Sequence, residues 1–250
     1  MTHPSNSEEI DVSVIIPGYN EELNIRRAIE RCKAALDELK LRHEIIIVDD
    51  CSTDATGKIA DALAAADPSI RVIHNPINLN VGASILIGYR AARGRLMTHN
   101  AMDLPFDTKD LGRIVPLFDD PDVALVVVAR TDRSAHSTWR KVTSWVHHWM
   151  VRTLFWVNIP DMNFVQVCRR SMVQNIGVRA RSPAFVTPEM IIRTKNAGMK
   201  IAHATAVFHQ REVGEAKHGK PRDILWTFAD MISFWLEGRG RRSAPEKGAR

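Results

Sequence analysis

Short runs of β-branched residues alternate with helical patterns over the first two thirds of this chain, and no other feature constrains its fold as strongly. Such alternation is typical of a mostly parallel β-sheet with helices packed on both of its faces. We therefore predict an α/β fold. The expected strands span residues 12–16, 44–48, 70–74, 95–99, 123–129 and 199–208.

The composition is that of an ordinary globular protein, with 45% hydrophobic and 25% charged side chains in 250 residues. Three cysteines leave one thiol unpaired in any disulfide scheme, which favours a reducing compartment. Residues 1–10 contain two Glu and no apolar run, so we expect no secretory signal and predict a cytoplasmic protein. The predicted organisation is a flexible N-terminus over 1–10, one main domain over 11–220, an amphipathic helix over 221–237 and a basic tail over 238–250.

The net charge of +5 is concentrated in the tail. Residues 238–250 hold five basic side chains and one Glu, a net +4, which leaves +1 for the remainder of the chain. A nucleic-acid-binding protein usually spreads Lys and Arg over a folded face with aromatic platforms. We therefore expect no nucleic-acid partner.

A helical pattern over residues 139–157 combines aromatic and basic side chains. Trp145, Trp149 and Trp156 recur along it, together with Arg152. Helices of this composition favour the interface between lipid and water, and basic residues near an anionic membrane contribute about 1 kcal/mol each. We therefore expect peripheral contact with a membrane surface. The alternative for these tryptophans is a place in the core beneath the sheet or in a homodimer contact.

Polar loops follow the first four expected strands. In open α/β sheets, ligands bind beyond the carboxyl ends of the strands. Asp49 and Asp50 leave a buried strand together, which is costly unless a metal, a ribose hydroxyl or a base N–H pairs with them. The alternative is that one of them caps the next helix, although Ser52 and Thr53 are available for that. We interpret the pair as part of a ligand site.

Three of these loops carry motifs that resemble family 2 glycosyltransferases. The motifs are Ser13-Val14-Ile15-Ile16-Pro17-x-Tyr19-Asn20-Glu21, Ile47-Val48-Asp49-Asp50-x-Ser52-Thr53-Asp54-x-Thr56, and Asn80-x-Gly82 with Gly88 and Gly94. The resemblance implies the Rossmann-like GT-A fold and a nucleotide-sugar donor, either GDP-mannose or a UDP-hexose. It also implies that Pro17, Tyr19, Glu21 and Asp50 hold the base and ribose, with Asp49 supporting the loop.

The later part of the chain is similar to dolichol-phosphate mannosyltransferases and other polyprenyl-phosphate sugar transferases. The residues that carry this likeness are Arg130, Arg140, Ser144, Asp161, Phe164, Arg169, Arg170 and the run Arg211-x-x-Gly214-x-x-Lys217. The resemblance implies that Arg130 and Arg140 stabilise charge during catalysis. It places Ser144, Arg211 and Lys217 at the phosphate of a polyprenyl phosphate acceptor. For any single Arg, a solvated surface ion pair is the alternative.

The expected metal site departs from the family pattern. The family's Asp-x-Asp motif holds a divalent ion on the diphosphate, and here Ala101 replaces its first Asp while Asp103 keeps the second. Mg²⁺ is often bound through one or two carboxylates and the phosphates of the substrate. The resemblance therefore implies Mg²⁺ or Mn²⁺ at Asp103, which would also be a catalytic residue. His99, Asn100 or Asp107 are the candidates to complete the site. The alternative is that Arg and Lys side chains compensate for the missing carboxylate without a metal.

We predict an inverting glycosyltransferase that moves one sugar from a nucleotide diphosphate to a polyprenyl phosphate. Two further departures bear on activity: Ala216 stands where the family has Ser, and Asp161-Met162-Asn163-Phe164 replaces a Ser-Gly-Phe run. A nucleotide-sugar-binding protein without transfer activity, acting as a regulator or partner, is therefore one alternative. A glycosyltransferase that acts on a soluble acceptor is the other.

Overall fold

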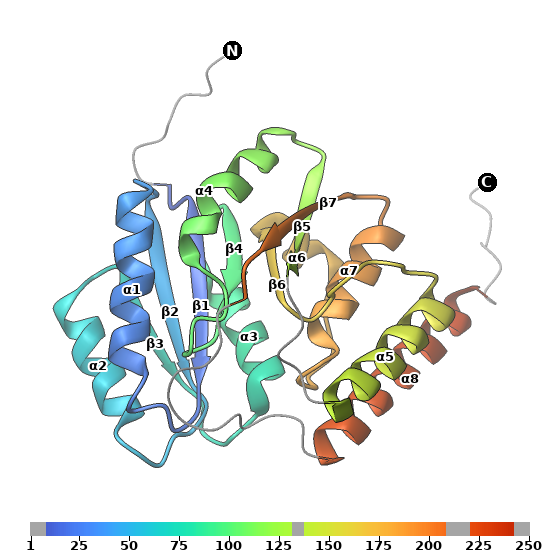
Figure 1. Ribbon diagram of the computed structural model, residues 1–250, viewed down its shortest axis with the longest axis horizontal. Coiled ribbons are helices and arrows are strands. Elements are labelled where there is room, and N and C mark those ends of the chain that lie inside the picture. The colour runs from blue at the N-terminus through green and yellow to red at the C-terminus, as the bar shows by residue number, and fades with distance from the viewer. Residues whose placement is uncertain (1–8, 132–137, 209–220, 243–250) are drawn as a thin grey trace, which may run out of the picture.

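A seven-stranded sheet runs through the middle of the molecule (Figure 1). The structure is a computed structural model that describes residues 9–131, 138–208 and 221–242, without the side chains of 138–144, 221 and 239–242. The strand order is β3-β2-β1-β4-β6-β5-β7. The strands are β1 (Val12–Gly18), β2 (His43–Asp49), β3 (Ile70–His74), β4 (Leu96–His99), β5 (Val123–Arg130), β6 (Val165–Arg169) and β7 (Lys200–Ala206).

Helices cover both faces of this sheet and make two separate cores. On one face, α1, α2 and α4 pack against alternate strand residues such as Val14 and Ile45. On the other face, α3, α5, α6, α7 and α8 pack against intervening residues such as Ile15 and Ile46. The helices are α1 (Ile25–Glu38), α2 (Thr56–Ala66), α3 (Asn80–Ala91), α4 (Leu111–Ile114), α5 (Thr138–Phe155), α6 (Arg170–Ile176), α7 (Val186–Asn196) and α8 (Pro221–Arg242).

The sheet is mostly parallel, as the alternating pattern predicts. Strands β1, β2, β3 and β4 pair in parallel, and β5 pairs in parallel with β7. Strand β6 lies between β4 and β5 and runs antiparallel to both. It was not among the expected strands. The parallel strands therefore end at one common edge, and β6 begins at that edge.

Helices α5 and α8 lie side by side at one end of the molecule (Figure 1). The Phe155 ring of α5 and the Phe234 ring of α8 are 5.4 Å apart between centroids, and both rings contact Phe185. Trp145, Trp149 and Trp156 have exposed fractions of 67%, 55% and 80%, so none of the three lies in the core. Within the described part of the chain, no helix is long and apolar enough to cross a membrane.

Candidate functional site

The loops at the carboxyl ends of β1 to β4 form a polar rim, which comprises residues 17–21, 49–54, 75–80 and 100–107. The register aligns Gly18 with Asp49 and Asp49 with His74, so the first three strands end level with one another. Of the seven described non-glycine residues with positive φ, four lie in this rim and a fifth in the loop before β6. These five are Asn20, Cys51, Asn80, Leu104 and Asp161. Such backbone conformations cluster at functional sites, where the surrounding structure holds them.

Asp50 ties β2 to the loop that follows β3. Its Oδ1 accepts hydrogen bonds from the Leu79 backbone N–H at 2.9 Å and from Asn75 Nδ2 at 2.8 Å. Its Oδ2 accepts from the Asn80 N–H at 2.9 Å. These bonds explain how a carboxylate that is only 4% exposed is accommodated. A direct role of Asp50 toward base or ribose stays a prediction.

Asp49 joins the loop after β2 to the end of β3. Its Oδ1 accepts from the Ser52 N–H at 3.1 Å, and its Oδ2 lies 3.0 Å from His74 Nδ1. The Ser52 hydroxyl in turn accepts from the Asn20 N–H at 2.9 Å. Asp49 therefore supports the loops around it through these bonds.

The first loop of the rim holds the other three residues that the resemblance assigns to the nucleotide. Pro17 lies in the buried strand β1, whereas the Tyr19 side chain is 37% exposed. Glu21 is 7% exposed, and its Oε2 accepts from Asn24 Nδ2 at 2.6 Å. The structure thus brings Tyr19, Glu21 and the two Asp residues to one edge of the sheet, and their contacts with a nucleotide stay predictions.

The loop after β4 supplies Asp103, while the three residues suggested as its metal-binding companions have other contacts. His99 Nδ1 lies 2.8 Å from the Tyr89 hydroxyl, and burial lowers the pKa of His99 to about 4. Asn100 donates to the Phe106 carbonyl at 2.8 Å and accepts from the Ala101 N–H. Asp107 accepts from the Lys109 N–H at 3.0 Å and so caps the short 3-10 helix Thr108–Asp110.

Arg130 lies at the end of β5 in an ion pair with Asp161. The guanidinium donates to Asp161 from Nε at 2.8 Å and from Nη2 at 2.7 Å, and the Arg130 backbone N–H donates to the same carboxylate. The Phe164 and Phe208 rings flank the guanidinium, with their centroids 5.3 and 5.4 Å from Cζ. Cation–π contacts and a bidentate pair hold the group in a defined orientation.

An aromatic cluster connects Arg130 with the Asp103 loop. Phe106, at the end of that loop, packs edge-on against Phe164 with centroids 6.3 Å apart, and it forms a β-bridge with Phe208. The same two rings, Phe164 and Phe208, flank Arg130. The structure therefore brings Arg130 to the side of the rim that carries Asp103.

Four of the predicted site residues have no described side chain. Arg140 and Ser144 belong to α5, but their side chains are outside the described residues. Arg211 and Lys217 lie in the segment 209–220, which is also outside them. Their roles stay predictions from the resemblance.

The described residues contain no cluster of three His, Cys, Asp or Glu side chains that could hold a metal by themselves. Asp103 is the only rim carboxylate that the family pattern assigns to a metal. One carboxylate fits an ion whose remaining ligands come from a diphosphate and from water. The donor set is therefore compatible with a metal that binds together with its substrate.

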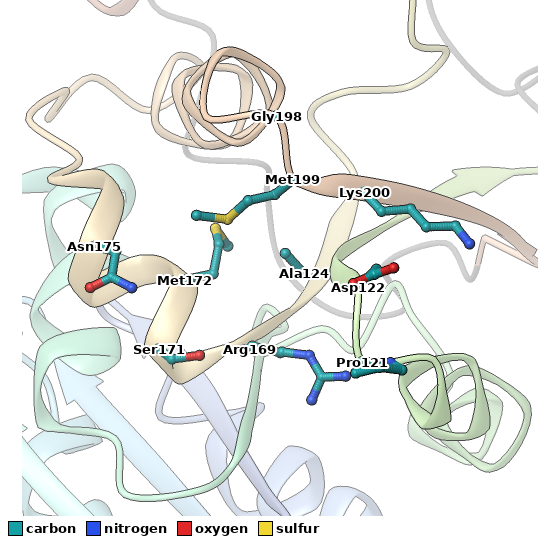
Figure 2. A pocket seen from close by; sticks show the side chains of 10 residues that line it. All are labelled: Pro121, Asp122, Ala124, Arg169, Ser171, Met172, Asn175, Gly198, Met199 and Lys200. Carbon is teal, nitrogen blue, oxygen red and sulfur yellow. The ribbon is translucent and has the colours of Figure 1, made fainter.

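The cavity in Figure 2 lies at the opposite edge of the sheet. It has a volume of about 620 Å³, and its lining includes Arg169 and Lys200, at the carboxyl end of β6 and the amino end of β7. Arg169 donates to the Val123 and Phe118 carbonyls, and Lys200 pairs with Asp120 at 2.6 Å. The cavity is therefore distinct from the polar rim, because it lies at the other end of the strands and its two basic residues already have partners.

Sequence reasoning missed two residues that organise the rim. Asn75, 5% exposed, donates to Asp50 and to the Ser84 hydroxyl, and His74 contacts Asp49. Both residues lie at the carboxyl end of β3. Their place at the end of an expected strand, where the polar loop 75–82 begins, was the available signal.

Known proteins with similar sequences or folds identify the class of this one. The family model described as Glycosyl transferase family 2 matches residues 13–175. Dodecaprenyl-phosphate galacturonate synthase from Rhizobium johnstonii is 27% identical over 94% of this chain and 70% of its own length. Undecaprenyl-phosphate mannosyltransferase from Micrococcus luteus is 26% identical over 82% of this chain and 86% of its own length.

The fold is also found among solved glycosyltransferases. The structure of glucosyl-3-phosphoglycerate synthase from Mycobacterium tuberculosis, in complex with Mn²⁺, UDP-glucose and phosphoglyceric acid, superposes with a TM-score of 0.70. The two are 17% identical, and the match covers 91% of this chain and 80% of that one. The architecture is therefore that of a GT-A sugar transferase. The chain belongs to glycosyl transferase family 2 and is a glycosyltransferase, which confirms the predicted fold class and family.

Proposed function

We propose that this enzyme transfers a single sugar, with inversion, from a nucleotide diphosphate sugar to a polyprenyl phosphate. The observation that carries the proposal is the polar rim, where Asp49 and Asp50 lie buried at the end of β2 and accept hydrogen bonds from their own loop and from the loop that follows β3. The two similar proteins named above, whose names include dodecaprenyl phosphate and undecaprenyl phosphate, support the choice of acceptor.

The chemistry requires positive charge near the leaving group. An oxygen of the acceptor phosphate attacks the anomeric carbon, the bond from that carbon to the diphosphate oxygen breaks, and the nucleoside diphosphate leaves with the electron pair. Fixed cations that stabilise this growing charge lower the barrier. Arg130 is oriented for such a role by Asp161, and Arg140 is the second candidate.

A phosphate acceptor needs no protein base. Its second pKa is about 6, so it is largely ionised at neutral pH. His99 lies directly before the Asp103 loop, but burial keeps it neutral and its Nδ1 is occupied by the Tyr89 hydroxyl. Ser144, Arg211 and Lys217 are the residues proposed to bind the acceptor phosphate.

Asp103 is the protein residue proposed to hold Mg²⁺ or Mn²⁺ on the diphosphate. A bound divalent ion would supply further positive charge at the leaving group. Because Ala101 stands where the family has Asp, the site has one carboxylate fewer, and we expect the metal ion to bind weakly when no donor is present. Asp103→Ala is expected to abolish transfer and to leave the fold intact, whereas the control Asp119→Ala, on the exposed surface, retains activity. Normal turnover by the Asp103 variant would refute this role.

A donor and acceptor panel tests the proposed reaction. Thermal shifts with UDP- and GDP-sugars, with and without Mg²⁺ or Mn²⁺, identify the donor, and product analysis with a polyprenyl phosphate identifies the acceptor. Nucleoside diphosphate release that depends on polyprenyl phosphate supports the proposal. Binding without turnover would point to the non-catalytic alternative, and a product without a lipid tail to a soluble acceptor.

The exposed tryptophans in α5 and directly after it are proposed to contact the cytoplasmic surface of a membrane. Trp145, Trp149 and Trp156 are exposed, and the basic tail over 238–250 supplies charge that complements anionic lipid. Deletion of that tail is expected to reduce cosedimentation with anionic vesicles at low salt. Unchanged cosedimentation would contradict the role of the tail, and a concentration-dependent dimer without vesicle binding would support the homodimer alternative.

A further inference from the structure

His74 lies between two carboxylates at the carboxyl end of β3. Its Nδ1 is 3.0 Å from Asp49 Oδ2, and its Nε2 is 2.9 Å from Asp61 Oδ1 on α2. An ionised carboxylate only accepts hydrogen bonds, and a neutral imidazole carries a single N–H. Both contacts are therefore satisfied together only when His74 is an imidazolium. Hydrogen bonds to Asp61 and then to Asp49 raise the pKa of His74 above its usual value of 6.5.

A chain of hydrogen bonds runs from His74 to the first loop of the rim. Asp49 accepts a hydrogen bond from the imidazolium on Oδ2 and one from the Ser52 N–H on Oδ1. The Ser52 hydroxyl accepts from the Asn20 N–H, and the Asn20 side chain accepts from the Thr53 N–H at 2.8 Å. Asn20 lies between Tyr19 and Glu21, which are residues proposed to bind the nucleotide.

The α2 backbone packs closely over the contact between His74 and Asp49. A Cβ added at Gly57 would lie 2.9 Å from Asp49 Oδ2 and 3.4 Å from His74 Cε1. The pair has little room to rearrange on that side, because a helix backbone moves less readily than a side chain. Close packing and two hydrogen bonds together set the direction in which the Asp49 carboxylate points.

We propose that His74 is a positioning residue for the donor: its imidazolium holds Asp49 and, through Ser52 and Asn20, the loop that carries Tyr19 and Glu21. The inference rests on the proposed function, because it takes this loop to be the nucleotide site. His74 acts through Asp49 and need not touch the substrate. Its protonation then sets donor affinity more than it sets the rate of the chemical step.

The direction of the pH effect follows from the charges around His74. The described charged groups that act on it are Asp49 from the end of β2 and Asp61 from α2, and both favour the imidazolium. As pH rises through the pKa of His74, one of the two hydrogen bonds is lost. Donor affinity therefore falls toward high pH. The side chain is 44% exposed, so solvent and salt moderate the effect.

Nucleotide affinity across pH tests the proposal. The dissociation constant of the identified nucleoside diphosphate is measured between about pH 5.5 and 8.5 for the wild type, His74→Gln and Asp61→Asn. His74→Gln is expected to weaken binding about threefold at the acid end and to remove the pH dependence. Asp61→Asn is expected to shift the midpoint to lower pH. In turnover assays, His74→Gln is expected to raise KM for the donor by a larger factor than it lowers kcat.

His203→Gln is the matched control, because His203 is an exposed histidine on β7. Strands β7 and β3 are the two outermost strands, on opposite sides of the sheet. It is expected to leave the pH profile of the wild type unchanged. A His74→Gln variant that is folded and keeps the wild-type profile would overturn the proposal.

An NMR titration separates this inference from the proposed function. If the wild type binds no nucleotide at any pH, the proposed function fails, and the titration still tests the hydrogen-bond chain. The amide signals of Ser52 and Asn20 are expected to shift with the same midpoint as the His74 ring. Amide signals that stay constant while His74 titrates would show that the loop does not respond to it.

Discussion

The Asp161 carboxylate receives three hydrogen bonds from Arg130, two from the guanidinium and one from the backbone N–H. Asp161 is only 1% exposed and adopts a positive φ of 54°. A buried carboxylate needs hydrogen-bond donors, and Arg130 supplies three of them. The two residues are 31 positions apart in the sequence. The contact joins the end of β5 to the loop before β6, and it fixes the direction of a cation that we place in the catalytic machinery.

Asp161→Asn is expected to lower the free energy of unfolding by about 3 kcal/mol, because it removes a buried carboxylate and leaves the partly buried Arg130 guanidinium without its counter-charge. Chemical denaturation measures the change. The control is Asp11→Asn, which removes a similar bidentate pair with Arg42 at a more exposed site and is expected to cost at most about 1 kcal/mol. Equal losses of unfolding free energy in the two variants would contradict the claim that burial makes the Arg130–Asp161 pair the stronger one.

Asp50→Asn is expected to destabilise the protein by about 1 to 3 kcal/mol and to weaken nucleotide binding. The amide presents an N–H group in place of one oxygen, so at least one of the donors Leu79, Asn80 and Asn75 loses its acceptor. Denaturation and calorimetric binding measure the two effects. The exposed Asp37→Asn is the control, and a stable Asp50 variant with normal affinity would count against this account.

Gly82→Ala is expected to cost about 1 to 3 kcal/mol through overpacking. A Cβ at this position would lie 2.4 Å from the Ser182 carbonyl oxygen, and Asp230 of α8 holds the Ser182 backbone by a hydrogen bond of 2.8 Å. Thermal unfolding measures the change. Gly238→Ala, in a helix where the described residues leave open space, is expected to be neutral or stabilising. Similar melting temperatures for the two variants would contradict the predicted clash.

Glu44→Gln is expected to lower stability by about 2 kcal/mol at neutral pH. Burial raises the pKa of Glu44, but hydrogen bonds from Ser13, the Arg93 backbone and Arg71 outweigh it, so the pKa lies below the usual 4.5. A lowered folded-state pKa adds stability above 4.5, and that stability is lost as pH falls through the folded value.

The difference between wild type and Glu44→Gln should therefore shrink under acid conditions, as denaturation at several pH values can measure. Glu30→Gln, at an exposed position on α1, provides a control without this pH dependence. A difference that stays constant from neutral to acid pH would mean that the ionised Glu44 carboxylate is not the source of the stability.

The amino-acid sequence by itself determined the layered α/β architecture and the edge of the sheet at which the polar loops lie. Buried apolar runs such as 12–18 and 44–48 appear in contiguous residues, and the polar residues that end them include Asp49 and Asp50. The spacing of apolar residues and the composition of each segment are local properties, so a single sequence reveals them. The family motifs lie in these same loops, and they led to the predicted glycosyltransferase.

Only the tertiary structure decided the place of β6 and the partners of the rim residues. The run Val165–Arg169 is short and contains Gln166, so it gives a weak strand signal, yet it lies between β4 and β5. Arg130 with Asp161, and Asp50 with Asn80, are pairs about 30 residues apart. Local propensity does not encode such pairings. They depend on which distant loops the packed sheet brings together, because only the finished core offsets the entropy cost of closing those loops.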